Sequence, residues 1–249
     1  MLLTIDVGNT NIKFGTFDGD ALTKFSIPTG DVSSVDDLRT AVVGRIDPRV
    51  CDVIVCSVVP AVDPLITQFA ETAFGCQAVL ITNKTDLGLK VRYQPLSSVG
   101  TDRLVNVFAA VEQFEFPFIV CSLGTATTFD VVNDDRVVLG GVIAPGINAM
   151  SRALHLSTAK LPDVEIEKPS QVISVDTQGA IRSGIFYGYI AMVEGIISRL
   201  RDEAEDDLVV IATGGAAPFI AKSTSVLGIV DEDLLLDGLR LIHERDHPA

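Results

Sequence analysis

The fold is decided near the start of the chain, which reads Leu2-Leu3-Thr4-Ile5-Asp6-Val7-Gly8-Asn9-Thr10-Asn11-Ile12-Lys13-Phe14-Gly15-Thr16. Apolar residues before Asp6 and alternating residues after Asn11 predict two strands joined by a polar turn. A second turn, Asp18-Gly19-Asp20, leads into a third strand-like run that ends near Ile27. The sequence therefore predicts an antiparallel meander with a polar first turn.

The first turn carries groups that suit a polyphosphate and its divalent cation. The Asp6 carboxylate can order Mg²⁺ or its water shell, and Gly8 lets the backbone approach a phosphate closely. Asn9, Thr10 and Asn11 offer side-chain hydrogen bonds to phosphate oxygens, and Lys13 adds positive charge. The same residues also make an ordinary β-turn, so this turn alone leaves both interpretations open.

A comparable order of elements begins again near Pro117. A buried-strand run leads into Ser122-Leu123-Gly124-Thr125, another strand-like run follows, and Ala212-Thr213-Gly214-Gly215 later joins a strand to a short helix. The order in the first part is β-β-β-α-β-α-β, and the second part begins in the same way. We therefore expect two similar α/β lobes, residues 1–115 and 116–249, whose Gly- and Thr-rich hairpin turns face each other across a cleft.

Composition excludes some classes of function. The formal net charge of −14 opposes binding to nucleic acid or to an anionic membrane surface. The four cysteines form no C-x-x-C pair, which favours buried thiols over a metal site or disulfide. The chain reaches Asp6 without a basic region followed by an apolar stretch, and no uninterrupted apolar run approaches 18 residues. These features predict a soluble, cytoplasmic protein that contacts neither nucleic acid nor membrane.

The order of these turns resembles the actin-like ATPase and sugar kinase superfamily, in which two hairpin turns hold phosphates and a later Gly-Gly segment holds adenosine. Within it, the chain is similar to the type III pantothenate kinases. The resemblance covers nearly the whole chain and includes these motifs: Asp6 to Thr10, Tyr93-Gln94-Pro95, Gly100-Thr101-Asp102-Arg103, Gly124 to Asp130, Gly140 to Gly146, Asp176-Thr177, Ser183 to Gly188 and Thr213-Gly214-Gly215. It implies two lobes of the actin-like (ribonuclease H-like) fold.

The resemblance also implies roles for individual residues. Asp102 is then the base that accepts the proton of pantothenate's primary hydroxyl as this oxygen attacks the γ-phosphate of ATP. The implied pantothenate contacts are Tyr93, Gly100, Thr101, Asp102, Arg103 and, from the partner subunit of a homodimer, Thr177. The implied ATP contacts are Asp6, Val7, Gly8, Asn9, Thr10, Asn11, Ile12, Lys13 and Thr125.

Purely structural roles compete with some of these assignments. Thr101 and Asp102 are also suited to cap a helix, with Arg103 on the surface, and Thr177 is suited to be the N-cap of a long helix.

One position departs from the family pattern. The second turn of the family begins with an Asp that ligates an activating monovalent cation, potassium or ammonium, whereas this chain has Ser122. A serine hydroxyl binds a cation without supplying negative charge, so the cation affinity should fall. An active pantothenate kinase using ATP, Mg²⁺ and K⁺ or NH₄⁺ is the first hypothesis. A catalytically impaired ligand-binding or regulatory protein is the second, and a kinase for another hydroxy acid or polyol is the third.

Overall fold

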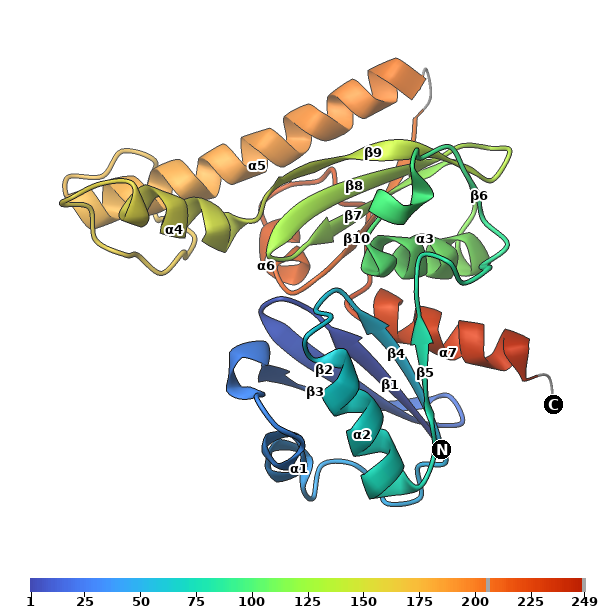
Figure 1. Cartoon of the computed structure of the whole chain (residues 1–249). Coiled ribbons are helices and arrows are strands. Elements are labelled where there is room, and N and C mark those ends of the chain that lie inside the picture. Colours follow the sequence, from blue (N-terminus) through green and yellow to red (C-terminus); the bar gives the residue numbers. More distant parts are fainter. Residues whose placement is uncertain (205–206, 248–249) are drawn as a thin grey trace. The chain divides into compact units, whose positions relative to one another are not determined.

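The computed structural model describes residues 1–204 and 207–247, which form two compact units (Figure 1). Unit 1 contains residues 1–114 together with the C-terminal residues from Asp233, and unit 2 contains Glu115–Glu232.

Unit 1 is built on a mixed sheet with the strand order β3-β2-β1-β4-β5. The meander predicted from the sequence is present, because β1 pairs antiparallel with β2 and β2 pairs antiparallel with β3. Strand β4 then pairs parallel with β1, and β5 pairs parallel with β4. The strands of this sheet are β1 (Leu2–Val7), β2 (Asn11–Asp18), β3 (Ala21–Pro28), β4 (Asp52–Ser57) and β5 (Ala78–Ile81). The short strand β6 (Lys90–Val91) also belongs to unit 1 but lies outside this sheet.

Helices cover both faces of the unit 1 sheet. Helices α1 and α2 pack on one face, where Val55, Ile66 and Phe69 are buried. Helices α3 and α7 pack on the other face, where Cys56, Val105 and Leu239 are buried. The helical segments are η1 (Thr29–Asp31), α1 (Val35–Val42), α2 (Asp63–Phe74), η2 (Leu96–Ser98), α3 (Thr101–Gln113) and α7 (Leu234–Asp246).

Unit 2 repeats the topology of unit 1. Its strands have the order β11-β10-β7-β8-β9, with β7, β8 and β9 in an antiparallel meander and β10 and β11 added in parallel. Its elements are β7 (Phe118–Leu123), β8 (Ala126–Val132), β9 (Val137–Pro145), α4 (Ile147–Leu156), α5 (Thr177–Ala204), β10 (Val209–Thr213), α6 (Ala217–Ala221) and β11 (Ile229–Val230). The topological repeat expected from the sequence is therefore present.

Helix α5 is the long core helix of unit 2. Phe186, Tyr189 and Val193 are completely buried in its core. The helix is also long and apolar enough to cross a membrane by length and composition, with 44% of its most apolar window buried within the protein. The core helix of a soluble protein meets the same criterion, so this finding is weak evidence for a membrane span.

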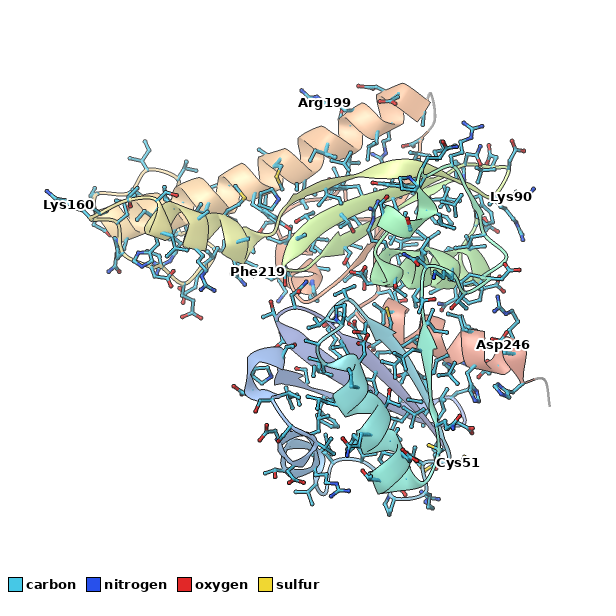
Figure 2. All side chains as sticks on the ribbon, in the orientation of Figure 1. Cys51, Lys90, Lys160, Arg199, Phe219 and Asp246 are labelled. Atoms are coloured by element: carbon cyan, nitrogen blue, oxygen red, sulfur yellow. The ribbon has the colours of Figure 1, made fainter. Side chains whose placement is uncertain are left out.

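The segment between α4 and α5, in which Figure 2 labels Lys160, is tied to both helices by hydrogen bonds. The Ser151 hydroxyl donates to the Val164 carbonyl over 3.0 Å, and the Ser183 hydroxyl donates to the Val172 carbonyl over 2.6 Å. These contacts hold an irregular segment against the two helices (Figure 1).

The predicted lobe of residues 116–249 differs from the compact units at its C-terminal end. Helix α7 belongs to unit 1, where it packs against α3, β1 and β4. A close contact explains its position, because a Cβ on Gly238 would lie 2.9 Å from the Val105 carbonyl oxygen and 3.0 Å from Ala109 Cβ. The absence of a side chain at Gly238 lets α7 approach α3, which the linear order of elements did not indicate.

Candidate active site

The Asp6 carboxylate lies near the carboxyl end of β1, on the face of the unit 1 sheet that α3 covers. In the sheet, Asp6 is opposite Lys13 of β2 and Cys56 of β4, so the three side chains point to the same face. Lys13 Nζ is 4.0 Å from Asp6 Oδ2, and the exposed fraction of the Asp6 side chain is 14%. The turn that follows β1 therefore begins with a mostly buried carboxylate and one nearby cation.

The environment of Asp6 disfavours its charged form. Burial raises its pKa from the ordinary 3.8 to about 6, Lys13 opposes this rise, and the negative charge of Asp102 adds to it. Asp102 lies far away in the sequence, but the helix that carries it, α3, packs on the sheet face to which Asp6 points, so its negative charge affects Asp6. Asp6 and Asp102 are the residues that the sequence assigned to Mg²⁺ and to proton transfer.

Residues 8–10, hereafter turn 1, connect β1 to β2. The Gly8 N–H donates to the Asn11 carbonyl over 3.0 Å, and the Thr29 N–H donates to the Thr10 carbonyl over 2.9 Å. Asn9 and Thr10 within this turn and the adjacent Asn11 are exposed, as a phosphate-binding turn requires.

Two residues expected to contact ATP have side chains that point into the core of unit 1. Val7 and Ile12 are fully buried in the core under α1 and α2, so only their backbone groups face the turn region. An ATP contact at these two positions would therefore have to use backbone groups. Strand alternation explains this, because Val7 and Ile12 point to the face opposite Asp6 and Lys13.

Asp102 occupies the first turn of α3 without acting as its N-cap. The N-cap is Gly100, and Thr101 and Asp102 are the first two helical residues. A Cβ on Gly100 would collide with Asp102 Oδ1, so the glycine makes room for this carboxylate. Burial raises the pKa of Asp102, and hydrogen bonding to the Arg103 N–H lowers it. The capping role that competed with catalysis for Asp102 is thus absent.

Arg103 is buried, with an exposed fraction of 5%, which contradicts the alternative of a surface arginine. Its guanidinium carbon lies 5.1 Å from the centre of the Tyr93 ring, and its Nη1 donates to the Tyr93 hydroxyl over 3.4 Å. This cation–π and hydrogen-bonding contact joins two of the residues expected to bind the acid substrate. Unit 1 therefore contains Asp6, Lys13, Tyr93, Asp102 and Arg103 as one set of charged and polar groups.

Unit 2 holds the second predicted turn, Gly124 and Thr125, hereafter turn 2. Ser122 is the fifth residue of β7, as Asp6 is the fifth residue of β1, and the two strands have the same burial pattern. Ser122 is opposite Thr128 in β8 and Thr213 in β10. The position that is negatively charged in unit 1 is therefore surrounded by hydroxyl groups in unit 2.

Asp130 is buried on the same face of the sheet as Ser122. It pairs with Val120, two residues before Ser122, so it lies farther from turn 2 than Ser122 does. The sequence-based argument that Asp130 lies beyond the turn is confirmed.

Glycines pack closely around turn 2. Gly146 donates its N–H to the Thr125 carbonyl over 3.2 Å, and a Cβ at Gly146 would collide with the carbonyls of Gly124 and Thr125. Gly214 has a φ of +89°, and a Cβ there would lie 2.7 Å from the Leu123 carbonyl oxygen. The third Gly-rich junction of the sequence is therefore packed directly against the end of β7.

Thr177 is the first residue of α5, and its exposed side chain does not cap the helix. Asp176 fills this role, because its Oδ1 accepts a hydrogen bond from the Gly179 N–H over 2.8 Å. Thr177 instead lines an apolar hollow of about 390 Å³ together with Leu154, Leu161 and Ile181. The N-cap interpretation of Thr177 is therefore wrong.

Comparison with known proteins gives the family. A family model described as type III pantothenate kinase matches residues 2–199. A type III pantothenate kinase from Paramagnetospirillum magneticum is 41% identical over 256 aligned residues, which cover 99% of this chain and 98% of that protein. The chain belongs to the type III pantothenate kinases.

Solved structures agree with the fold of this family. A Campylobacter jejuni protein described as a Baf family transcriptional activator has a TM-score of 0.61 at 18% identity, with 98% of both chains covered. A Sinorhizobium meliloti protein described as a 2-dehydro-3-deoxygalactonokinase has a TM-score of 0.57 at 12% identity, covering 100% of this chain and 98% of that one. The two-lobed actin-like fold expected for a type III pantothenate kinase is therefore confirmed.

Sequence reasoning missed one polar contact in this pantothenate kinase. The buried Thr127 hydroxyl, just after turn 2, lies 2.7 Å from the Tyr189 hydroxyl of α5. Burial raises the pKa of Tyr189 to about 12, and the hydrogen bond to Thr127 opposes this rise. The sequence held only a weak signal for this contact, because a tyrosine in an apolar helix does not reveal its partner.

Proposed function

We propose that this member of the family transfers the γ-phosphoryl group of ATP to the primary hydroxyl of pantothenate. The products are ADP and 4′-phosphopantothenate, and the reaction is the first step of coenzyme A biosynthesis. The observation that carries this proposal is the proximity of Asp6 and Asp102, which brings a cation-ordering carboxylate near a candidate base. Membership in the family supports the choice of substrates.

Asp102 accepts the proton from the attacking hydroxyl. Its buried position raises the pKa of the carboxyl, which makes the carboxylate a stronger base. Because phosphoryl transfer passes through a loose transition state, orientation of the hydroxyl by Asp102 matters as much as proton removal. Arg103, held by Tyr93, supplies positive charge for the carboxylate of pantothenate.

The residues of unit 1 fit a magnesium ion. Asp6 is a buried carboxylate with a raised pKa, so positive charge near it would stabilise its ionised form. Among the described residues, no group of three or more His, Cys, Asp or Glu side chains is arranged to hold a metal. This agrees with kinase sites in which Mg²⁺ uses one or two carboxylates and the substrate's phosphates. When bound, Mg²⁺ neutralises charge on the phosphates, and Asp6 would hold it.

Turns 1 and 2 would bind phosphate oxygens through backbone N–H groups and hydroxyls. Gly8, Asn9 and Thr10 contribute from unit 1, and Thr125 contributes from unit 2. The monovalent cation, K⁺ or NH₄⁺, would contact the Ser122 hydroxyl. Because this oxygen is neutral, we expect weaker cation binding than a carboxylate at the same position would give.

The homodimer is also part of the proposal. The large apolar side chains of Ile173 and Val175 are 82% and 94% exposed, just before Thr177. A second copy covering them would bury apolar area beside the hollow that Thr177 lines. Light scattering should give twice the mass of one chain, and Val175→Asp should yield monomers if this surface is the interface.

Location and other partners remain predictions. The net charge of −14 disfavours nucleic acid and anionic membrane surfaces as partners. A protein that uses ATP is expected in the cytoplasm, where ATP is available.

The decisive experiment measures ADP and phosphopantothenate with ATP, Mg²⁺ and pantothenate, in K⁺, in NH₄⁺ and without either ion. We expect turnover that Asp102→Asn reduces by ~10²–10⁴-fold while pantothenate still binds. Asp36→Asn is the matched control, because this α1 carboxylate is 89% exposed and lies in the same unit. Absence of phosphorylation under every cation condition would overturn the proposal.

A catalytically impaired ligand-binding or regulatory protein is the second candidate, and Ser122 is the observation that favours it. This candidate predicts that ATP and pantothenate bind without turnover. Recovery of turnover in Ser122→Asp would assign the defect to this one position.

A further inference from the structure

Two cysteines lie close together at the end of the unit 1 sheet opposite turn 1. Cys51 directly precedes β4, and Cys76 lies two residues before β5. These strands are parallel, with Val53 opposite Ala78 and Ile54 opposite Val79. Continuing the same register by two residues places Cys51 opposite Cys76.

The sheet conformation extends back to Cys51. Its N–H donates to the Met1 carbonyl over 3.1 Å, which continues the pairing of β4 with β1. Figure 2 shows the labelled Cys51 side chain beside the start of the chain. The sheet pairing is therefore present on the β4 side as far as Cys51.

Both cysteines point to the same face of the sheet. Side chains alternate along a strand, and Val53 and Val55 of β4 lie in the core under α1 and α2, so Cys51 points to that face as well. Cys76 packs against the same core together with Ala78. Neighbouring strands are ~4.8 Å apart, within the ~4.4–6.8 Å range of Cα separations in disulfides.

The electrostatics support the proximity of the two thiols. Burial raises the pKa of Cys76, and the nearby Asp52 and Cys51 raise it further. Cys51 is exposed, whereas Cys76 is half-buried. The accessible Cys51 is therefore the thiol that meets an oxidant first, and Cys76 is the neighbour that can react with it.

We propose that Cys51 and Cys76 are an oxidation site that forms a reversible intramolecular disulfide. The oxidant is a peroxide. The Cys51 thiolate attacks a peroxide oxygen, breaking the O–O bond and giving a sulfenic acid. Cys76 sulfur then attacks the Cys51 sulfur and displaces hydroxide, which leaves as water with the Cys76 proton. Two thiols lose two electrons in total, one hydrogen peroxide becomes two waters, and a thiol reductant restores both thiols.

The disulfide ties together the amino-terminal ends of β4 and β5 and closes the loop that contains α2. Asp6 and turn 1 lie at the other end of the sheet, where Asp6 pairs with Cys56. Oxidation should therefore stabilise unit 1 without altering the candidate active site. The cross-link should raise the thermal midpoint by ~5 °C.

The test uses the full-length reduced protein treated with hydrogen peroxide, then denatured, alkylated and analysed by mass spectrometry. We expect two of the four cysteines to become unavailable to alkylation, with a peptide linkage between Cys51 and Cys76 that dithiothreitol reverses. Cys51→Ser and Cys76→Ala should each abolish the linkage. Cys121→Ser, a buried thiol in unit 2, is the control that should retain it.

Alkylation of both Cys51 and Cys76 after peroxide treatment would overturn the proposal. So would a Cys51 disulfide that links two chains in place of the internal one. The readout is covalent, so it is independent of kinase turnover.

Discussion

The two units build the same strand, turn and strand, yet they supply different chemistry at the same position. In unit 1, Asp6 faces Lys13 and its pKa is raised by burial and by Asp102. In unit 2, Ser122 faces Thr128 in the same place along the sheet. A shared backbone topology therefore does not determine where charge is located.

The difference separates two tasks. Unit 1 contains the ionisable residues assigned to proton transfer and substrate charge, namely Asp6, Asp102 and Arg103. Unit 2 contributes the backbone groups of turn 2. Gly146 and Gly214 have no side chain, so the segments that contain them pack closely against turn 2 and the end of β7. Substitutions in the two units should accordingly change different measured quantities.

Among the substitutions that compare the two turns, the largest effect is expected from Asp6→Asn, which makes the unit 1 position as uncharged as Ser122. Loss of the carboxylate should reduce kcat/KM by ~10²–10³-fold, because the cation on the phosphates loses its anionic ligand. Steady-state kinetics with varied Mg²⁺ would measure this. Activity within tenfold of wild type would contradict the role of Asp6.

The same variant should gain stability at neutral pH. The folded-state pKa of Asp6 is about 6 against 3.8, so between these values the folded state binds more protons than the unfolded state. Stability from this group is therefore fully present below pH ~4 and falls by about 3 kcal/mol as the pH rises through 6. An asparagine at position 6 does not ionise, so the stability of Asp6→Asn does not fall in this way. Its thermal midpoint should therefore exceed that of wild type at pH 7.5, and the two midpoints should become similar at pH 4. An equal difference at both pH values would contradict this assignment.

A smaller effect is expected from Gly214→Ala in unit 2. The φ of +89° and the contacts of a Cβ with Leu123 should destabilise unit 2 by about 1–3 kcal/mol and raise the KM for ATP. Gly215→Ala is the matched control, because a Cβ there has no heavy atom within 4 Å. Similar melting curves for the two variants would contradict this prediction, because they would show that a methyl group at position 214 does not destabilise unit 2.

Ser122→Asp makes unit 2 resemble unit 1 more closely. A carboxylate opposite Thr128 has no lysine partner of the Lys13 type in the sheet pairing, so it should attract a monovalent cation. The K⁺ concentration needed for half-maximal activation should fall by ~10-fold. Ser122→Asn, of similar size but uncharged, should leave that concentration unchanged, and an equal shift in both variants would exclude charge as the cause.

The smallest effect is expected from Tyr189→Phe. It removes the hydrogen bond to Thr127, but the Thr127 hydroxyl keeps a contact of 3.3 Å with the Pro145 carbonyl. We expect a loss of about 1 kcal/mol in the free energy of unfolding and little change in kcat. A double-mutant cycle with Thr127→Val would measure the coupling, and additive effects would show that the two hydroxyls contribute independently.

Much of the fold could be predicted from the sequence, because the strands around Asp6 and Ser122 are short apolar runs with polar or Gly-containing turns. The sequence suggested Thr101 and Asp102 as possible caps of a helix, so their positions as the first two helical residues of α3 were not predicted. The placement of α7 was wrong, since it depends on the contact of Gly238 with Val105, which are distant in sequence. Burial of Arg103 against Tyr93 was likewise invisible to local patterns.

The sequence by itself determined the repeated strand order, the identity of the turn residues and the family, because these depend on local periodicity and on motifs read along the chain. Tertiary structure decided which face each side chain occupies, the packing of the helix that carries Asp102 over the face of Asp6, and the capping of α5 by Asp176. The physical reason is that burial and pairwise electrostatics depend on distances between residues remote in sequence, which strand register and helix packing establish.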